Sequence, residues 1–497
     1  MPRCRFETHH KHRGERIRPI SCLIMALMFM ISADAAAAQS PQKWVTSRTG
    51  SVQGPYPIGN PSAQPDLSLA FPSPETGARD QSFRLIVRPD LWGGQVRLRF
   101  SNALGTRPAT FDGVHVGLQQ TAAALVPGSN QPVSFAGKSS TTVAPGMSVW
   151  SDPVPLPFVP DPATAELLGR KLAVSFHIVG ESGPMTWHAK ALTTSYLTPP
   201  GAGAKGGTED ENAFPFSTAS WYFLDALDMM APADARAIAA FGDPITDGTA
   251  STMNGDDRWP DVLARRLHAV YGNKVAVVNA GIGGNQVVGP AEYSPQKPFP
   301  GGPSAKDRLE RDVLSLSSIA AVVWLEGIND FSKNGNASVE AVEAGMKEVV
   351  GRIRAKLVDA RIIGATVTSA LGSTNANHGS PEQDAKRKAL NDFIRTGSLF
   401  DGVADFDAAT LDPQTGGMRA EFVPESTMGG PGDKLHPNRV GYLVIGGQLG
   451  LVAAPGGACN PVHRRDLPDA ALSALRRSVL LRQDQAPLGL RGLRAGA

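Results

Sequence analysis

The residues best suited to acid–base chemistry lie near the C-terminal end, in the segment 432–437 with the sequence GDKLHP. Asp433 and His436 are three residues apart, so one tight turn can bring the carboxylate to the imidazole. Such a carboxylate fixes the tautomer of the imidazole and supports its protonated form, which makes the histidine a general base. A loop with an incidental histidine would have the same spacing, so both interpretations stay open at this point.

Three other short segments could complete a hydrolytic site: 240–248 (AFGDPITDG), 279–285 (NAGIGGN) and 326–330 (EGIND). The glycine-rich second segment can present bare backbone N–H groups, and Asn329 in the third can offer a side-chain N–H to an anion. Donors that converge in this way form an oxyanion hole. Glycines serve tight turns equally well, so a purely structural role for the second segment also stays open.

The part of the chain that contains these segments alternates apolar strands with helices. Strands are expected at 237–241, 274–279, 319–325, 361–367 and 403–406, and helices at 259–271, 305–316, 339–357 and 381–396. The strands are apolar on both faces, which is typical of a parallel sheet covered by helices. Right-handed crossovers then give a three-layer α/β/α sandwich, and the four segments are expected just past the carboxyl ends of its strands.

In order and spacing, the four segments resemble the SGNH/GDSL hydrolase family over roughly residues 236–450. The resemblance implies the SGNH hydrolase fold and a serine ester hydrolase. In the family, the first segment reads G-D-S-hydrophobic-T-x-G, and its serine is the nucleophile. The resemblance assigns Gly284 and Asn329 as oxyanion donors, His436 as the general base and Asp433 as the carboxylate that orients it. It also extends upstream, since a jelly-roll β-domain precedes the catalytic domain in many secreted bacterial members.

One position departs from the family pattern, because Pro244 stands where the family has its nucleophilic serine. Proline has no hydroxyl, so no acyl-enzyme can form there, and it lacks the backbone N–H that in this family helps to bind the oxyanion. Loss of one oxyanion donor typically costs ~100- to 1,000-fold in rate, and loss of a nucleophile costs more. We therefore predict an ester hydrolase whose activity is strongly impaired. The alternative is a secreted, catalytically inactive protein that binds a carbohydrate or an ester.

Two other routes to ester cleavage stay open. A water molecule held by His436 could attack the ester directly, or a hydroxyl close to Pro244 could replace the missing serine. These hydroxyls belong to Thr246, Thr249, Ser251 and Thr252. The nearby carboxylates are expected to have structural roles, Asp243 and Asp247 as turn and helix-capping residues and Asp330 as a structural residue.

Residues 39–232 are expected to form a β-sandwich of jelly-roll type. Short runs such as QSFRLIVRPDL, GQVRLRFSNAL and KLAVSFHIVG alternate apolar and polar residues, as half-buried strands do. Packing in the core is the expected role of the tryptophans, and stacking on sugars is the alternative. These tryptophans are Trp92, Trp150, Trp187 and Trp221. The histidines of this region, which are expected to be structural or surface residues, are His115, His177 and His188.

The two ends of the chain carry different signals. Residues 1–38 combine a basic start, an apolar run too short for a comfortable membrane span and a small-residue cleavage pattern, which predicts a signal peptide and a secreted or periplasmic protein. Without them, Lys plus Arg falls from 48 to 42 and Asp plus Glu from 46 to 43, so the net charge changes from +2 to −1. Cys459 then stays as the single cysteine, which excludes an intrachain disulfide. The α/β domain is expected over 233–452, and an Arg-rich, poorly ordered tail over 453–497.

Composition and motifs argue against several other functions. Hydrophobic residues make up 41% of the chain and charged residues 19%, as in a soluble globular protein, and the mature charge does not favour binding to nucleic acid. Gln286 stands where a dinucleotide fingerprint needs its third glycine, and no P-loop sequence is present. No third ligand is spaced beside Asp433 and His436 for a metal ion. We therefore expect no cofactor, no metal and no stable membrane span, and a small-molecule or glycan ester as the partner.

Overall fold

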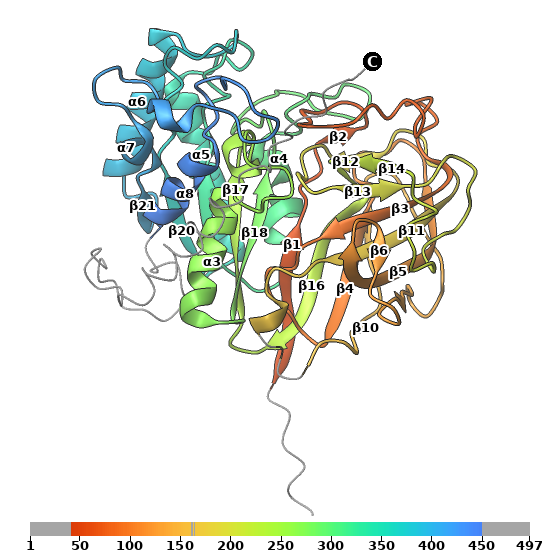
Figure 1. The fold of residues 1–497 in the computed structure, drawn as a ribbon. Helices are drawn as coiled ribbons and strands as arrows, with labels where there is room; N and C mark the ends of the chain where they lie inside the picture. The colour runs from red at the N-terminus through yellow and green to blue at the C-terminus, as the bar shows by residue number, and fades with distance from the viewer. Residues whose placement is uncertain (1–40, 161–162, 164, 450–497) are drawn as a thin grey trace, which may run out of the picture. The chain divides into compact units, whose positions relative to one another are not determined.

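The structure is a computed structural model, and Figure 1 shows its course. It describes residues 41–160, 163 and 165–449. The predicted signal peptide at 1–38 and the predicted tail at 453–497, which includes Cys459, lie outside the described residues. Among the described helices, none is long and apolar enough to cross a membrane.

The described residues from Gln42 onward form one compact unit. Strands dominate residues 42–232, which we call the β-rich part, and strands alternate with helices over residues 233–449, which we call the α/β part. These names follow the secondary structure, and the predicted division into two domains stays a prediction.

Two antiparallel sheets dominate the β-rich part. The strands of the first are β1 (Gln42–Thr49), β4 (Gln95–Ser101), β9 (Ser148–Trp150), β10 (Val154–Pro155) and β16 (Leu224–Pro232). They pair in the order β1–β16–β4–β10, with β9 also paired to β4. The strands of the second are β3 (Arg79–Val87), β5 (Ala109–Thr121), β6 (Ala124–Leu125), β7 (Gln131–Pro132), β8 (Thr141–Val143), β11 (Leu172–Glu181), β13 (Ser195–Leu197) and β14 (Phe216–Thr218). They pair in the order β14–β13–β3–β11–β5–β6, with β7 and β8 also paired to β5.

The two sheets pack face to face through aromatic side chains. The ring of Phe100 on β4 lies 5.1 Å from that of Phe111 on β5 and 5.2 Å from that of Phe176 on β11, and all three are fully buried. Such packing of two inner faces is what the alternating sequence pattern requires. The prediction of a β-rich N-terminal part is confirmed, and the jelly-roll topology stays a prediction.

A third, small sheet joins β2 (Gly54–Pro55), β12 (Thr186–His188) and β15 (Trp221–Tyr222). Two of the predicted core tryptophans, Trp187 and Trp221, lie on it and are almost fully buried, as is Trp92 elsewhere in the β-rich part. Trp150 is half-buried at the margin of the core, where the guanidinium carbon of Arg97 lies 4.4 Å from its ring centroid. The prediction of core packing is therefore confirmed for three of the four.

Two of the predicted structural histidines make contacts within the second sheet. His177 lies between two carboxylates, with Nδ1 at 2.7 Å from Asp112 and Nε2 at 3.0 Å from Asp80. The Nδ1 atom of His115 lies 3.0 Å from the carbonyl oxygen of Gly113. These contacts tie strand residues to each other, which is the structural role that was predicted.

A five-stranded parallel sheet forms the centre of the α/β part. Its strands are β17 (Arg236–Gly242), β18 (Val275–Gly281), β19 (Ile319–Leu325), β20 (Arg361–Ala365) and β21 (Gly402–Ala404). They pair in the order β18–β17–β19–β20–β21, and every pair is parallel. The carboxyl ends of the first three therefore lie at one edge of the sheet, where the residues that follow them can meet.

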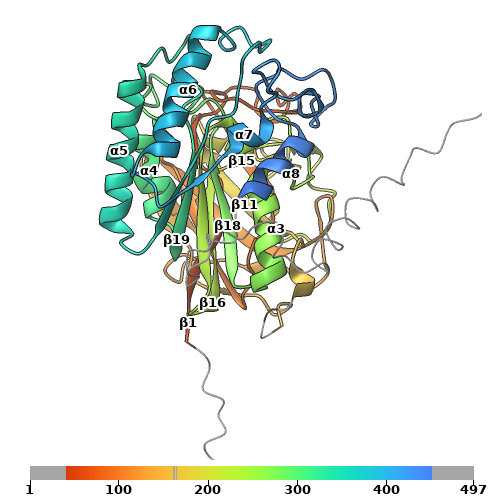
Figure 2. The ribbon, with the colours of Figure 1, turned by 90° about the vertical axis from the view of Figure 1, so that its left-hand side faces the viewer.

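Helices cover both faces of the parallel sheet, as predicted. They are α2 (Pro244–Asp247), α3 (Trp259–Tyr271), α4 (Ala305–Leu309), α5 (Val339–Lys356), α6 (Pro381–Thr396), α7 (Phe406–Thr410) and α8 (Arg439–Gln448). Figure 2 shows α4, α5 and α6 on one side of β18 and β19, and α3 and α8 on the other. Neighbouring residues of β17 face opposite sides of the sheet. Phe241 packs in the hydrophobic core that contains α5, and Ala240 packs in the core that contains α3 and α8. This is the predicted three-layer α/β/α arrangement.

The β-rich part also contacts this sheet directly. Strand β1 packs against β17 and β18. The Oδ2 atom of Asp90 accepts a hydrogen bond from the backbone N–H of Val277 on β18 at 2.6 Å. Because one hydrophobic core has members from both parts, the positions of the strand ends depend on the β-rich part as well.

Local signals explain where several elements begin and end. Helices α3 and α6 and strand β19 have the predicted bounds, and α6 begins with a capping box in which Ser380 and Gln383 bond each other's backbone N–H. The helix predicted over 305–316 is α-helical only to Leu309 and then widens into a π-helical turn, η2 (Glu310–Leu314). The strand predicted over 403–406 ends early because Asp405 caps α7. Two further short turns are η1 (Ala165–Leu167) and η3 (Ala420–Phe422).

Candidate active site

Strand β17 ends at Gly242, and the chain turns at once into α2, which begins with Pro244. The Oδ1 atom of Asp243 accepts a hydrogen bond from the backbone N–H of Ile245 at 3.0 Å, so Asp243 caps α2 as predicted. Proline suits the first position of a helix, because its fixed φ matches the helix and no N–H is needed there. The local backbone therefore accommodates Pro244 without strain. Compared with a serine at this position, Pro244 lacks a hydroxyl group and a backbone N–H donor.

Asp433 and His436 form the predicted pair. The Oδ2 atom of Asp433 lies 2.7 Å from Nδ1 of His436, and Oδ1 accepts the backbone N–H groups of Leu435 and His436, each at 2.9 Å. Burial alone would raise the pKa of Asp433, but the hydrogen bond and charge of His436 and the two backbone N–H groups outweigh it and hold that pKa below its usual range. An ionised carboxylate at Nδ1 leaves Nε2 of the imidazole as the proton acceptor.

The pair reaches the site by a route that differs from the prediction. Segment 432–437 does not follow a strand, since it lies in the loop before α8. A second loop, after β20, fixes it in place. The backbone carbonyl of Asp433 accepts hydrogen bonds from the hydroxyl of Ser373 at 2.6 Å and from the backbone N–H of Thr374 at 3.1 Å.

A cavity of about 510 Å³ brings the predicted site residues together. Its walls include Pro244, Gly284, Asn329 and His436, and Asp433 is bonded to His436 without lining the cavity itself. The other residues of the wall include Asn60, Lys190, Thr249, Asn334, Asn375, Asn377 and His378. Segments that are far apart in the sequence therefore meet around one space large enough for a small organic ligand.

The two predicted oxyanion donors both face this cavity. Gly284 has a φ of +86°, and among the described residues its backbone N–H has no acceptor. One N–H of the Asn329 side chain donates to the carbonyl oxygen of Asn285 at 2.9 Å, which fixes the amide and leaves its second N–H for a ligand. Next to it, Asp330 accepts the N–H groups of Val287 and Val288, so it has the structural role that was predicted.

Asp247 has a different role from the predicted one. It does not cap a helix, because its Oδ2 atom accepts the backbone N–H of Gly283 at 2.8 Å and its Oδ1 atom lies 3.3 Å from Nε2 of His188. His188 in turn is held by its Nδ1 atom, 2.7 Å from the carbonyl oxygen of Ser51. Asp247 therefore fixes the loop that carries Gly284, and the prediction that His188 is structural is confirmed.

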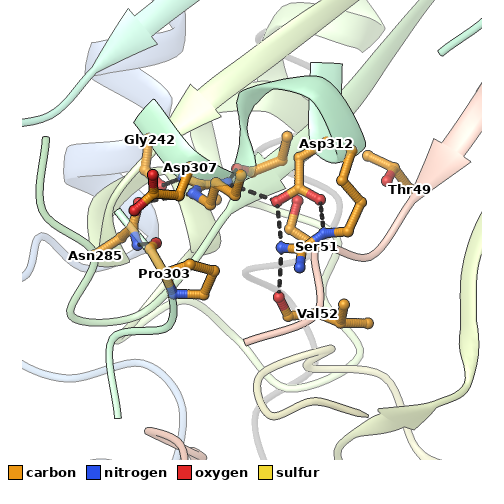
Figure 3. Close-up of polar contacts among 12 residues, drawn as sticks. Thr49, Ser51, Val52, Gly242, Asn285, Pro303, Asp307 and Asp312 are labelled. Atoms are coloured by element: carbon orange, nitrogen blue, oxygen red, sulfur yellow. Dashed lines mark hydrogen bonds and ion pairs between the residues drawn. The ribbon is translucent and has the colours of Figure 1, made fainter. Parts of the chain in front are cut away.

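A fully buried guanidinium holds the strand ends in position. Arg308 donates to the carbonyl oxygens of Gly242 at 2.8 Å and Ala280 at 2.7 Å, to Oδ1 of Asn285 at 2.7 Å and to Oδ2 of Asp312 at 3.1 Å. Figure 3 shows polar contacts around Asp312, with Gly242 and Asn285 to its left and Val52 below it. Gly242 lies two residues before Pro244, and Asn285 directly follows Gly284 at the end of residues 282–285, which we call the oxyanion loop after its predicted role. One side chain therefore sets the relative position of the two segments.

Two other acids of this region are buried without a full set of partners. Asp243 and Glu326 are fully buried, and neither Oδ2 of Asp243 nor Oε1 of Glu326 has a hydrogen-bond partner. Burial raises the pKa of both carboxyls, and the charge of Glu326 adds to the effect on Asp243. A neutral carboxyl needs fewer partners than a carboxylate, which fits structural roles for these two acids.

Two cavity residues were missed by the sequence reasoning. Lys190 comes from the β-rich part, is 3% exposed, and donates through Nζ to the hydroxyl of Thr249. His378 comes from the loop after β20, and burial followed by the charge of His436 lowers its pKa to about 4. Neither belongs to a motif, and only the packing of distant segments places them beside His436.

Of the four hydroxyls weighed as replacements for serine, one lines the cavity. Thr249 does so, whereas Thr246 is fully buried and Ser251 nearly so. Among the described residues, no group of three or more His, Cys, Asp or Glu side chains is placed to hold a metal ion.

Comparison with known families gives a match to part of the chain. Residues 240–444 match the model of the GDSL-like Lipase/Acylhydrolase family, which defines a GDSL-like domain over this segment. The segment covers all five predicted site residues and leaves out the β-rich part. No curated protein was found that matches the chain.

The solved structures found by comparison cover 42–43% of this chain, about as much as the family model covers. A lipase/acylhydrolase from Enterococcus faecalis is 23% identical, with 43% of this chain and 92% of that chain covered and a TM-score of 0.32. A carbohydrate acetylesterase from Sinorhizobium meliloti is 16% identical, with 42% and 94% covered and a TM-score of 0.30. A GDSL-like lipase from Bacteroides thetaiotaomicron is 16% identical, with 43% and 85% covered and a TM-score of 0.31.

Proposed function

We propose that this protein is an ester hydrolase of the GDSL type whose turnover is strongly impaired by Pro244. The observation that carries the proposal is the meeting of the Asp433–His436 pair with Gly284 and Asn329 around one cavity, next to a proline at the nucleophile position. The site keeps a general base and two N–H donors and lacks the attacking oxygen.

A serine at position 244 would complete a known sequence of steps. Nε2 of His436 would take the proton of the hydroxyl while the serine oxygen attacks the ester carbonyl. The N–H of Gly284 and the amide of Asn329 would donate to the oxyanion that forms. The protonated imidazole would then give its proton to the leaving alcohol, and a water molecule would release the acyl group as a carboxylic acid.

The test is to compare the unmodified chain with its Pro244→Ser variant on p-nitrophenyl acetate. We expect kcat/KM to rise by about 1,000-fold or more, because removal of a triad nucleophile costs at least that much. Pro244→Ala is the matched control, because it removes the proline ring without supplying a hydroxyl. Its kcat/KM should stay as low as that of the unmodified chain. In the double variant that combines Pro244→Ser with His436→Asn, the rise in kcat/KM should be lost. Equal and high turnover by the unmodified chain and the serine variant would show that the nucleophile lies elsewhere.

A second candidate function is ligand binding without cleavage. It is favoured by the amide side chains around the cavity, since such groups donate and accept hydrogen bonds from sugar hydroxyls. They belong to Asn60, Asn329, Asn334, Asn375 and Asn377. Calorimetric titration with acetylated and deacetylated oligosaccharides tests it. Selective binding without released acetate would support it, and no binding to either would refute it.

The proposed compartment for either function is outside the cytoplasm. The support is the signal-peptide pattern of residues 1–38. Expression of the full chain in a bacterial host, followed by N-terminal sequencing of the extracytoplasmic protein, should give a chain that begins at Gln39. Retention of the intact chain in the cytoplasm would argue against export.

A further inference from the structure

Among the described residues, the buried side chain of Lys190 has no ionic partner. Its side chain belongs to a residue that is 3% exposed, and Nζ makes one hydrogen bond, to the hydroxyl of Thr249. Among the ion pairs of the described residues, none includes Lys190, so no carboxylate lies within 4.0 Å of Nζ. An ammonium group has three N–H donors, and among the described residues two of those of Lys190 have no acceptor.

The ammonium group lies beside the oxyanion loop. A methyl group added to Gly283 would come within 2.9 Å of Nζ, so the nitrogen is almost in contact with that backbone. Gly283 directly precedes Gly284, whose N–H also has no acceptor among the described residues. Lys190, Gly284, His436 and Pro244 all line the same cavity.

The acids near Lys190 have other partners. Asp247 bonds the N–H of Gly283 and faces His188, and Asp433 bonds His436. Burial lowers the pKa of Lys190, and the charges of these two carboxylates oppose that effect from a distance. A buried ammonium with unused donors is costly unless a partner is supplied, and the cavity is where that partner can enter.

We propose that this cavity binds a carboxylate, with one oxygen on Nζ of Lys190 and the other on the N–H of Gly284. A carboxylate is planar and has two oxygens, so it can span two neighbouring donors. The proposal rests on the proposed function for the role of Gly284, and it makes the cavity a receptor for the acid that ester cleavage would release.

A monoanion fits this site better than a dianion. Lys190 brings one positive charge, and Asp247 and Asp433 are close enough to influence it. A dianionic phosphate would add a second negative charge near both carboxylates, which repel it. A carboxylate satisfies the unused donors with a single negative charge, so Asp247 and Asp433 repel it less than they repel a dianion.

The test measures binding of small probes to the unmodified chain at pH 7. Acetate is the probe, acetamide is its neutral counterpart of nearly the same shape, and inorganic phosphate tests the other anion. We expect acetate to bind about 10-fold or more tightly than acetamide, as a charge-assisted hydrogen bond allows, and more tightly than phosphate. Lys190→Met should remove the preference for acetate. Lys274→Met, which removes an exposed lysine paired with Asp234 and far from the cavity wall, should keep it.

Three results would overturn the proposal: equal binding of acetate and acetamide, a preference that survives Lys190→Met, or tighter binding of phosphate. If Lys190→Met does not fold, as judged by its thermal unfolding, the comparison of acetate with acetamide on the unmodified chain still decides the matter. No turnover is needed for this measurement. An inactive Pro244→Ser variant would therefore count against the proposed function and leave the result for acetate standing.

Discussion

Replacement of Arg308 by methionine should lower the free energy of unfolding more than replacement of an exposed charged residue does. The arginine is fully buried, and its guanidinium donates to Gly242, Ala280, Asn285 and Asp312. It also lies over the ring of Phe241, 4.2 Å from the centroid. Methionine would keep much of the apolar stem and remove every donor.

The magnitude follows from what is left behind. Each hydrogen bond from a charged donor contributes about 1.5–3 kcal/mol, but the four bonds share one group and do not add. Removal of one partner of a buried ion pair costs about 3–5 kcal/mol, because the remaining charge is uncompensated. The carboxylate of Asp312 also contacts Arg311, which places the expected loss at the lower end, about 3 kcal/mol.

Urea unfolding followed by tryptophan fluorescence measures this loss as a shift of the midpoint. Arg354→Met is the matched control, because Arg354 is exposed and pairs with Asp401 on the surface, where a loss below about 1 kcal/mol is expected. Hydrogen exchange should also quicken at the ends of β17 and β18. A loss for Arg308→Met no larger than that for Arg354→Met would refute the reasoning that this guanidinium holds the strand ends.

Two further predictions concern the walls of the cavity. His378 has a pKa of about 4 in the folded protein and 6.5 as a free side chain. As the pH falls, this histidine is therefore protonated in the unfolded chain before it is protonated in the folded protein. Up to about 3 kcal/mol of stability is lost between pH 6.5 and 4. His378→Gln should show a smaller difference between urea midpoints at pH 7 and 4.5, and an unchanged difference would contradict the assignment. Gly284→Ala should lower stability by about 1–3 kcal/mol, because φ is +86° and the new methyl would lie 2.6 Å from Nδ2 of Asn60. Gly169→Ala has the same φ of +86° and open space around it, so thermal unfolding of the two variants separates contact from backbone strain, and equal losses would exclude the contact.

Much of the α/β part could be predicted because its signals are local. The apolar run of β19, the period of α3 and the capping box at Ser380 are each contained within one element. The pairing of Asp433 with His436 was predictable for the same reason, since the two residues share one turn. The predicted meeting of Gly284 and Asn329 with this pair came from the family resemblance and the rule that strand ends meet at one edge.

The rest depends on contacts between distant segments. Nothing in the sequence around Lys190 indicates that the turn after β12 brings it to the oxyanion loop. The role of Asp247 was predicted from its neighbours, and its true partners, Gly283 and His188, come from other elements. The break of the helix after Leu309 likewise has no local signal, as 305–316 is apolar at helical spacing throughout.

The presence of Asn60 and Lys190 in the cavity wall has a consequence for how this protein can diversify. Both residues precede the predicted acid–base pair by more than 200 residues, and both also contact loops of the α/β part. Asn60 donates to the carbonyl oxygen of Gly283 and Lys190 to the hydroxyl of Thr249, so a change at either position also acts on those loops. Substitutions in the loops around these two positions should therefore change which ligands the cavity accepts. A segment trimmed to residues 240–444 would lack this part of the cavity wall.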